Sequence, residues 1–180
     1  MGHLKYKIII AGPPAVGKTS LLHRFIDNSF QNNYKLTIGT EFLTKMIQFK
    51  KQEAKLAIWD IGGQRRFAQI RRTFYAGTNG ILLVFDLTKQ ETFDEMKTWL
   101  NEIYETIREE VPFVLIGNKL DLIKATGRAF NYNESKLFAA ERNSIYIETS
   151  AKTGDNVEFA FKRLTQIIAE RNGIKITLEE

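Results

Sequence analysis

Hydrophobic residues along this chain follow two patterns that alternate from one end to the other. Short, nearly continuous apolar runs predict buried strands at residues 7–11, 81–86 and 113–117. Longer stretches, at residues 93–107 and 157–168, repeat their apolar residues every three or four positions and therefore predict amphipathic helices. This alternation predicts an α/β fold, an open and mostly parallel sheet with helices on both faces.

Three further segments complete a predicted sheet of six strands. Residues 42–50 and 55–60 are strand candidates, and the polar turn 51–53 between them predicts an antiparallel hairpin at the sheet edge. A last strand is expected at residues 144–148, and a helix is expected to begin near Lys18. Sheets of this kind bind their ligands outside the carboxyl ends of the strands, so the loops that follow the strands are the places to look for function.

Composition limits the class of protein. A length of 180 residues with 43% hydrophobic residues fits one compact domain over residues 1–180. The formal charge of +5 is modest and is explained chiefly by solvated surface side chains. The chain contains no cysteine, which excludes disulfides and thiol–metal sites. No apolar run has the roughly 18 residues of a membrane span and no signal peptide is evident, so we expect a cytoplasmic protein.

A phosphate-binding pattern directly follows the first predicted strand. Residues 12–19 fit GxxxxGK[ST] between a strand and a helix, a context that disfavours a chance glycine-rich turn. Backbone N–H groups in such a loop, together with a helix N-terminus, attract a polyphosphate. We expect Lys18 to reach the β- and γ-phosphates and the Thr19 hydroxyl to bind Mg2+. The nucleotide-binding residues expected here are Ala15, Val16, Gly17, Lys18, Thr19 and Ser20.

A second motif, Asp-Ile-Gly-Gly-Gln at residues 60–64, ends the third predicted strand. Asp60 is expected to hold Mg2+ through a water. The amide of Gly63 is expected to contact the γ-phosphate, because glycine lets the backbone approach closely. Gln64 is expected to orient the attacking water. Alone the motif is weak, and its place at a strand end downstream of the phosphate loop strengthens it.

Two more motifs, Asn-Lys-Leu-Asp at residues 118–121 and Ser-Ala-Lys at residues 150–152, follow predicted strands. They predict a site for the base of a nucleotide. The Asp121 carboxylate can accept from N1–H and the 2-amino group of guanine, and adenine offers neither donor there. Sites built on such pairing reject an analogue by roughly 10^4–10^5. By itself the first of these motifs could equally be a surface turn. The guanine-binding residues expected here are Asn118, Lys119, Asp121, Ser150, Ala151 and Lys152. Among them the Ala151 amide is expected to meet the guanine O6.

In this order the four motifs resemble the Ras superfamily of small GTPases over nearly the whole chain, and segments such as 37–42, 80–86 and 148–152 resemble Rab sequences. The resemblance implies a P-loop NTPase G domain. Such a domain binds GTP with Mg2+, hydrolyses it slowly to GDP and acts as a switch in membrane trafficking or signalling. It also implies that Thr37 binds Mg2+ and the γ-phosphate and, with Gln64 and Lys18, serves catalysis. Phe30 is implied to pack edge-on against guanine.

The resemblance also implies protein partners. Phe42, Trp59 and Phe74 match an aromatic trio that Rab-like proteins present to effectors, and ordinary core packing is the alternative. An exchange factor and a GTPase-activating protein are expected. The chain has no basic extension that would suggest nucleic acid as a partner, and no terminal cysteine for a lipid anchor. Peripheral contact with membranes stays open.

Some residues depart from the Rab pattern. The segment 60–65 resembles Arf and Gα sequences instead, and Arg65 stands where Rab proteins carry a glutamate that helps nucleotide exchange. Pro14 lies near the expected catalytic centre, so two other interpretations are kept: a nucleotide-holding scaffold that hydrolyses negligibly, and a metabolic nucleotide kinase. Four arginines of the second switch form a cluster that is either a docking patch for an acidic partner or lipid, or a solvated helix face: Arg65, Arg66, Arg71 and Arg72.

Overall fold

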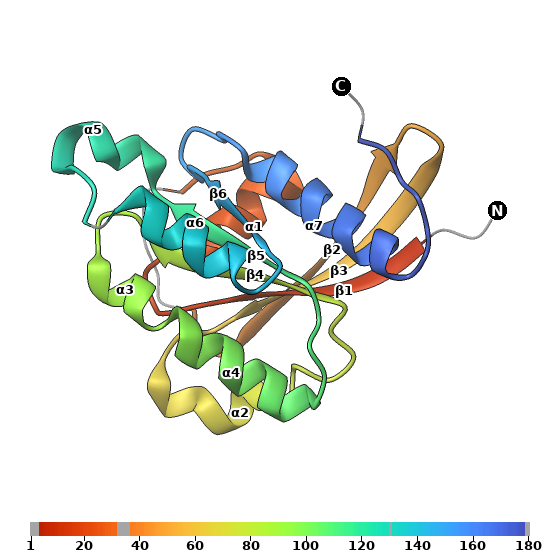
Figure 1. Ribbon diagram of the computed structural model, residues 1–180, viewed down its shortest axis with the longest axis horizontal. Helices are drawn as coiled ribbons and strands as arrows, with labels where there is room; N and C mark the ends of the chain where they lie inside the picture. Colours follow the sequence, from red (N-terminus) through yellow and green to blue (C-terminus); the bar gives the residue numbers. More distant parts are fainter. Residues whose placement is uncertain (1–3, 32–36, 130, 179–180) are drawn as a thin grey trace.

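The computed structural model describes residues 4–31, 37–129 and 131–178, and its core is one sheet of six strands (Figure 1). The strands follow the order β2-β3-β1-β4-β5-β6. Their bounds are β1 Leu4–Ala11, β2 Thr40–Phe49, β3 Gln52–Ile61, β4 Gly80–Asp86, β5 Phe113–Asn118 and β6 Ile145–Glu148. All neighbours pair in parallel except β2 and β3, which form an antiparallel hairpin at the edge. The predicted sheet is confirmed.

The hairpin turn is shorter than the sequence predicted. Gln52 pairs with Phe49 across the hairpin, so only Lys50 and Lys51 remain between the strands. Gln52 and Glu53 are polar because they lie near the tip of an edge hairpin, where a strand residue meets solvent, and polarity alone was misread as a turn.

Helices cover both faces of the sheet (Figure 1). On one face lie α1 (Lys18–Asp27) and α7 (Val157–Arg171), whose Phe25 and Phe161 rings stack with centroids 3.9 Å apart. The other face carries the remaining main helices, α2 Ala68–Arg72, α3 Gln90–Asp94, α4 Met96–Ile107 and α6 Tyr132–Ala140. Shorter turns complete the described chain, namely the 3-10 helices Arg65–Phe67 and Leu120–Leu122 and the single-turn α5 Ile123–Thr126. The helix predicted at 93–107 is therefore two helices that meet at Glu95.

The central strands explain the continuous apolar runs. Ile8 and Ile10 of β1 belong to the hydrophobic cluster under α1 and α7, whereas Ile9 and Ala11 belong to the cluster on the opposite face. Successive side chains of a strand point to opposite faces, so a strand covered on both sides is apolar at every position. All residues of β4 are buried in the same way.

The carboxyl ends of the five parallel strands all lie at the same end of the sheet, and each of the four sequence motifs begins there. No helix in the described part of the chain is long and apolar enough to cross a membrane.

Candidate functional site

Two adjoining cavities lie at the carboxyl ends of the parallel strands. The smaller, of ≈ 150 Å3, is lined by the phosphate loop, the start of α1 and the residues Thr37, Gly63 and Gln64. The larger, of ≈ 410 Å3, lies between Phe30 and the loops after β5 and β6. Both are lined by a shared set, Ala15, Gly17, Ser20, Phe30 and Gln31. The fold thus brings residues that are far apart in sequence to one continuous hollow.

The phosphate loop wraps around the amine of Lys18. Lys18 Nζ donates to the carbonyl oxygens of Gly12 at 2.8 Å and Pro13 at 2.7 Å. Burial lowers the pKa of Lys18 to about 8, and the charge of Asp60 opposes this shift. Ala15 and Gly17 have left-handed backbone angles, φ 67° and 97°. Left-handed residues in such a loop turn successive N–H groups toward a common point, the geometry of an anion-binding nest.

Oxygen atoms gather beside this loop in a set suited to a hard cation. The hydroxyl oxygens of Thr19 and Thr37 lie 2.6 Å apart, and Thr19 donates to Asp60 Oδ2. Asp60 is fully buried, and its other oxygen, Oδ1, has no hydrogen-bond partner among the described residues. Burial raises the pKa of Asp60 despite the nearby charge of Lys18. A buried orphan carboxylate oxygen requires a partner, and hydroxyl and carboxylate oxygens are ligands that Mg2+ prefers.

This set contains one carboxylate only. Within the described ranges no three His, Asp or Glu side chains form a metal-binding group. A magnesium ion at this place would therefore take further oxygen ligands from phosphates and water, as nucleotide-bound Mg2+ does. The residues present fit that group.

The segment after β3 lies directly against the phosphate loop. A Cβ atom on Gly63 would stand 2.5 Å from Pro14 N and 2.6 Å from Pro13 C, so only glycine fits here. Gly62 N donates to Gly39 O at 2.9 Å, which joins this segment to the one that carries Thr37. Gln64 lines the smaller cavity, and its Nε2 atom is buried without a partner in the part of the chain described. This amide is available to a molecule in the cavity.

Asn118, at the end of β5, joins the phosphate loop to the loop that follows β6. Its Nδ2 donates to Val16 O at 2.9 Å, and its Oδ1 accepts from Thr149 Oγ1 at 3.1 Å and from Ala151 N at 3.3 Å. Asn118 and Val16 are buried. Asn118 nevertheless lines the larger cavity, whereas Val16, predicted to bind the nucleotide, lines neither cavity. The Ala151 amide, expected to meet a base, donates to Asn118.

The carboxylate of Asp121, predicted to recognise the base, is held in place by a neighbouring loop. Ser150 Oγ donates to Asp121 Oδ1 at 2.6 Å. Asp121 lines the larger cavity together with Leu122, Lys119 and Lys152. Ser150 itself is fully buried, so its contribution is to orient Asp121.

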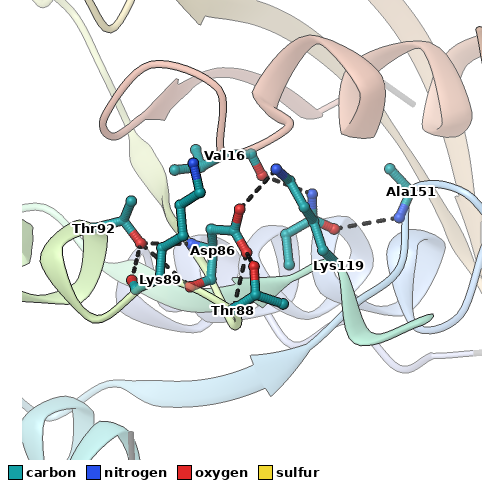
Figure 2. A network of polar contacts seen from close by, with 8 residues as sticks. Val16, Asp86, Thr88, Lys89, Thr92, Lys119 and Ala151 are labelled. Carbon is teal, nitrogen blue, oxygen red and sulfur yellow. Dashed lines mark hydrogen bonds and ion pairs between the residues drawn. The ribbon is translucent and has the colours of Figure 1, made fainter. Parts of the chain in front are cut away.

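Asp86 is a buried acid to which sequence reasoning assigned no role, and it holds Lys119 in position. Lys119 Nζ lies 2.7 Å from Asp86 Oδ2, and the Asp86 side chain is 1% exposed. The other oxygen, Oδ1, accepts from Thr88 N at 2.9 Å and Thr88 Oγ1 at 2.7 Å (Figure 2). The available signal was an acid at the end of an otherwise apolar strand. Four residues that line the cavities were not predicted from the sequence as site residues: His23, Ser29, Gln31 and Leu122.

The aromatic trio lies outside the cavities, with Phe42 and Trp59 paired across the hairpin and Phe74 beside them. The ring centroids of Phe42 and Trp59 are 4.8 Å apart, and those of Trp59 and Phe74 are 5.6 Å apart. Phe42 is 49% exposed, whereas the other two are partly buried against the core. The rings form one continuous surface whose exposed end is Phe42.

The arginine cluster is not one patch. Arg65, Arg66 and Arg72 are exposed, but Arg71 is buried and ion-paired with Glu102, so it faces away from any surface partner. The patch hypothesis is therefore wrong for Arg71.

The parallel sheet, the loop around Lys18 and the adjoining cavities define the class of protein: a P-loop nucleotide-binding protein. The Ras family model matches residues 7–170. The chain is 42% identical over 170 residues to Ras-related protein Rab-18-B of Danio rerio, covering 93% of this chain and 81% of the relative. It is 41% identical over 167 residues to Ras-related protein Rab-1 of Theileria parva, covering 92% and 75%.

The chain therefore belongs to the Ras family and is a Rab-like small GTPase. Proteins of this family bind GTP and GDP, hydrolyse GTP to GDP and act as molecular switches, and the Rab branch acts in membrane trafficking. Effectors, exchange factors and activating proteins are the general partners of the family.

Proposed function

We propose that GTP lies across the two cavities, with its phosphates in the smaller and its guanine in the larger. The observation that carries this proposal is the convergence of four separate motifs on one continuous hollow. Asp121 lines the larger end and accepts from the guanine edge. Phe30 and the aliphatic stems of Lys119 and Lys152 cover the faces of the base and ribose.

The hydroxyls of Thr19 and Thr37, and Asp60 through a water, would hold Mg2+ beside the smaller cavity. When bound, the ion neutralises charge on the β- and γ-phosphates. The orphan oxygen of Asp60 and the 2.6 Å separation of the two hydroxyl oxygens support this assignment.

Hydrolysis is an in-line attack of water on the γ-phosphorus. The bond from that phosphorus to the bridging oxygen breaks, and GDP and phosphate leave. The Gln64 side chain and the Thr37 carbonyl orient the water, and the Gly63 amide contacts the γ-phosphate. The Lys18 ammonium has three N–H donors and donates two of them to the loop carbonyls, so one remains for a phosphate oxygen. Lys18 and the loop amides stabilise the developing charge.

Intrinsic turnover is slow and depends on an activating protein. None of the described residues that line the cavities is an arginine. In related chemistry an arginine supplied by a partner contributes roughly 10^3–10^5 in rate. We expect the activating protein to supply that charge, and Pro14, which lines the smaller cavity, to shape how it enters.

The output is a change of order in residues 32–42 and 62–76 that depends on the γ-phosphate. Residues 32–36 lie outside the described residues. Effectors read the state at the surface formed by Phe42, Trp59 and Phe74, supported by the exposure of Phe42 beside the Gly62–Gly39 link. An exchange factor resets the switch. The protein works in the cytoplasm and at membrane surfaces, with protein partners and no nucleic acid.

The test is to identify the nucleotide that the purified protein carries. The protein is denatured and the released nucleotide is separated by ion-exchange chromatography, alongside a Gln64→Ala variant purified in the same way. GDP in the wild-type protein and GTP in the variant are expected. GTP in both would indicate a non-hydrolysing scaffold, and adenine nucleotide would overturn the role of Asp121.

A further inference from the structure

Arg71 is the one buried member of the arginine cluster among the described residues. It is 7% exposed, while its neighbour Arg72 is exposed. Burying a guanidinium is unfavourable unless its charge and its N–H groups are matched. The contacts of Arg71 therefore indicate what this position is built to hold.

One edge of the guanidinium is locked onto α4. Arg71 Nε donates to Glu102 Oε1 at 2.7 Å and Nη2 to Glu102 Oε2 at 2.5 Å, a two-pronged pair. The guanidinium carbon of Arg71 lies 4.0 Å from the ring centroid of Trp99. Trp99 is three residues before Glu102, on the same face of α4. Tyr75, which is fully buried, donates from its hydroxyl to Glu102 Oε1 at 2.8 Å. A bidentate, stacked guanidinium of this kind cannot be reproduced by lysine.

The other edge of the guanidinium reaches the active-site segment. Arg71 Nη1 donates to the backbone carbonyl of Gln64 at 3.3 Å. The same carbonyl accepts from Phe67 N at 3.1 Å. The helix that carries Arg71, α2, has only five residues, and helices this short do not hold their position without tertiary contacts. Arg71 thus connects the backbone of Gln64 directly to α4, and this connection is called the tether below.

We propose that Arg71, fixed by Glu102 and Trp99, is a positioning residue for GTP hydrolysis. It holds the Gln64 backbone so that the Gln64 amide reaches the attacking water. Hydrolysis depends on this tether, whereas nucleotide binding does not, because neither Arg71 nor Glu102 lines a cavity. The inference rests on the proposed role of Gln64.

The experiment compares Arg71→Lys with Arg72→Lys, a matched control that makes the same substitution on the exposed neighbour. Each full-length protein is loaded with GTP and single-turnover hydrolysis is measured, together with the dissociation rate of a fluorescent GDP analogue. A displacement of 1 Å can cost roughly 10^2-fold in rate, so for a loosened tether we expect a loss of about tenfold. Arg72→Lys should match the wild type, and GDP dissociation should change less than about twofold in both.

Two further variants separate positioning from folding. Glu102→Gln removes the charge that fixes Arg71 while keeping the side-chain size, and it should slow hydrolysis in the same direction. In a Gln64→Ala background the Arg71→Lys substitution should cause no further loss, because residues that act through one another are not additive.

The outcomes are distinguishable. If Gln64→Ala is slow but Arg71→Lys and Glu102→Gln hydrolyse at the wild-type rate with only a lowered melting temperature, Arg71 is merely structural and the inference is overturned. If Gln64→Ala hydrolyses normally, the proposed role of Gln64 fails and the inference fails with it. A loss in Arg71→Lys that persists undiminished in the Gln64→Ala background also overturns it.

Discussion

Gly63→Ala is the sharpest available test of how closely the second switch segment approaches the phosphate loop. The added Cβ would lie 2.5 Å from Pro14 N, 2.6 Å from Pro13 C and 2.7 Å from Gly12 O. All three atoms belong to the backbone, so no side chain can swing aside. Ordinary contact begins at 3.4 Å, and the difference from 2.5 Å is 0.9 Å, which is how far one of the two segments must withdraw.

A withdrawal of that size matters for hydrolysis because Gln64 is the next residue. A misplacement of about 1 Å can cost on the order of 10^2-fold in rate. We therefore expect single-turnover GTP hydrolysis by Gly63→Ala to fall about hundredfold, while the guanine site, whose lining includes neither Gly63 nor Gln64, still binds GDP. The assay is release of phosphate from preloaded GTP, with GDP affinity measured on the same preparation.

Gly80→Ala is the matched control. Its Cβ would meet Ile168 Cδ1 at 2.6 Å, a comparably tight approach, but to a flexible side chain far from the cavities. It should lower stability and leave hydrolysis intact. If Gly63→Ala hydrolyses GTP as fast as the wild type, the close approach of Gly63 to the phosphate loop does not exist in the GTP-bound protein and the reasoning is refuted.

Three other changes test separate parts of the structure. Asp121→Asn loses two charge-assisted bonds of about 1.5–3 kcal/mol each, so GDP affinity should fall roughly 10^2–10^4-fold in a fluorescence titration. Unchanged affinity would remove Asp121 from base recognition. Asp86→Asn and Lys119→Ala should each speed GDP release, and their combination should do no more than Lys119→Ala alone; additive effects would show that Asp86 does not act through Lys119. Burial raises the pKa of Glu102, but the hydrogen bonds from Arg71 and Tyr75 and the charges of Arg71 and Arg72 together outweigh it and hold the pKa below the ordinary value of 4.5. The stability that Glu102 provides is therefore complete above pH 4.5 and is lost as the pH falls through the lower folded pKa. Urea unfolding should show the gap between wild type and Glu102→Gln closing over that range; a gap independent of pH would contradict this.

The sheet was predictable because its central strands are covered on both faces. Such strands are nearly continuous apolar runs, as β4 is up to Asp86 at its end, and their short length indicates strands and not helices. The motifs of the site were predictable because each directly follows a strand. By contrast, α6 buries only Ser135 and Ala139 and presents little apolar periodicity, so its sequence does not announce a helix.

The contacts that support the site could not be predicted, because they join residues whose neighbours are set by the fold. Four arginines of similar appearance stand between residues 65 and 72, and only the packing of α2 on α4 places Glu102 and Trp99 opposite Arg71. The ion pair between Asp86 and Lys119 likewise spans a strand end and a separate loop. The sequence pointed to most of the residues that line the cavities and missed the contacts that hold them in place.

The placement of the two tryptophans gives this protein its own optical reporters. Trp59 lies partly buried between Phe42 and Phe74, one residue before the buried Asp60, and successive residues of a strand point to opposite faces. Its indole therefore senses the outer surface while its backbone is joined to the proposed metal site. Trp99 is buried under the Arg71 guanidinium. A Trp99→Phe variant would emit only from Trp59 and report changes in the aromatic trio. A Trp59→Phe variant would emit only from Trp99 and report changes around Arg71. Neither measurement needs an added label.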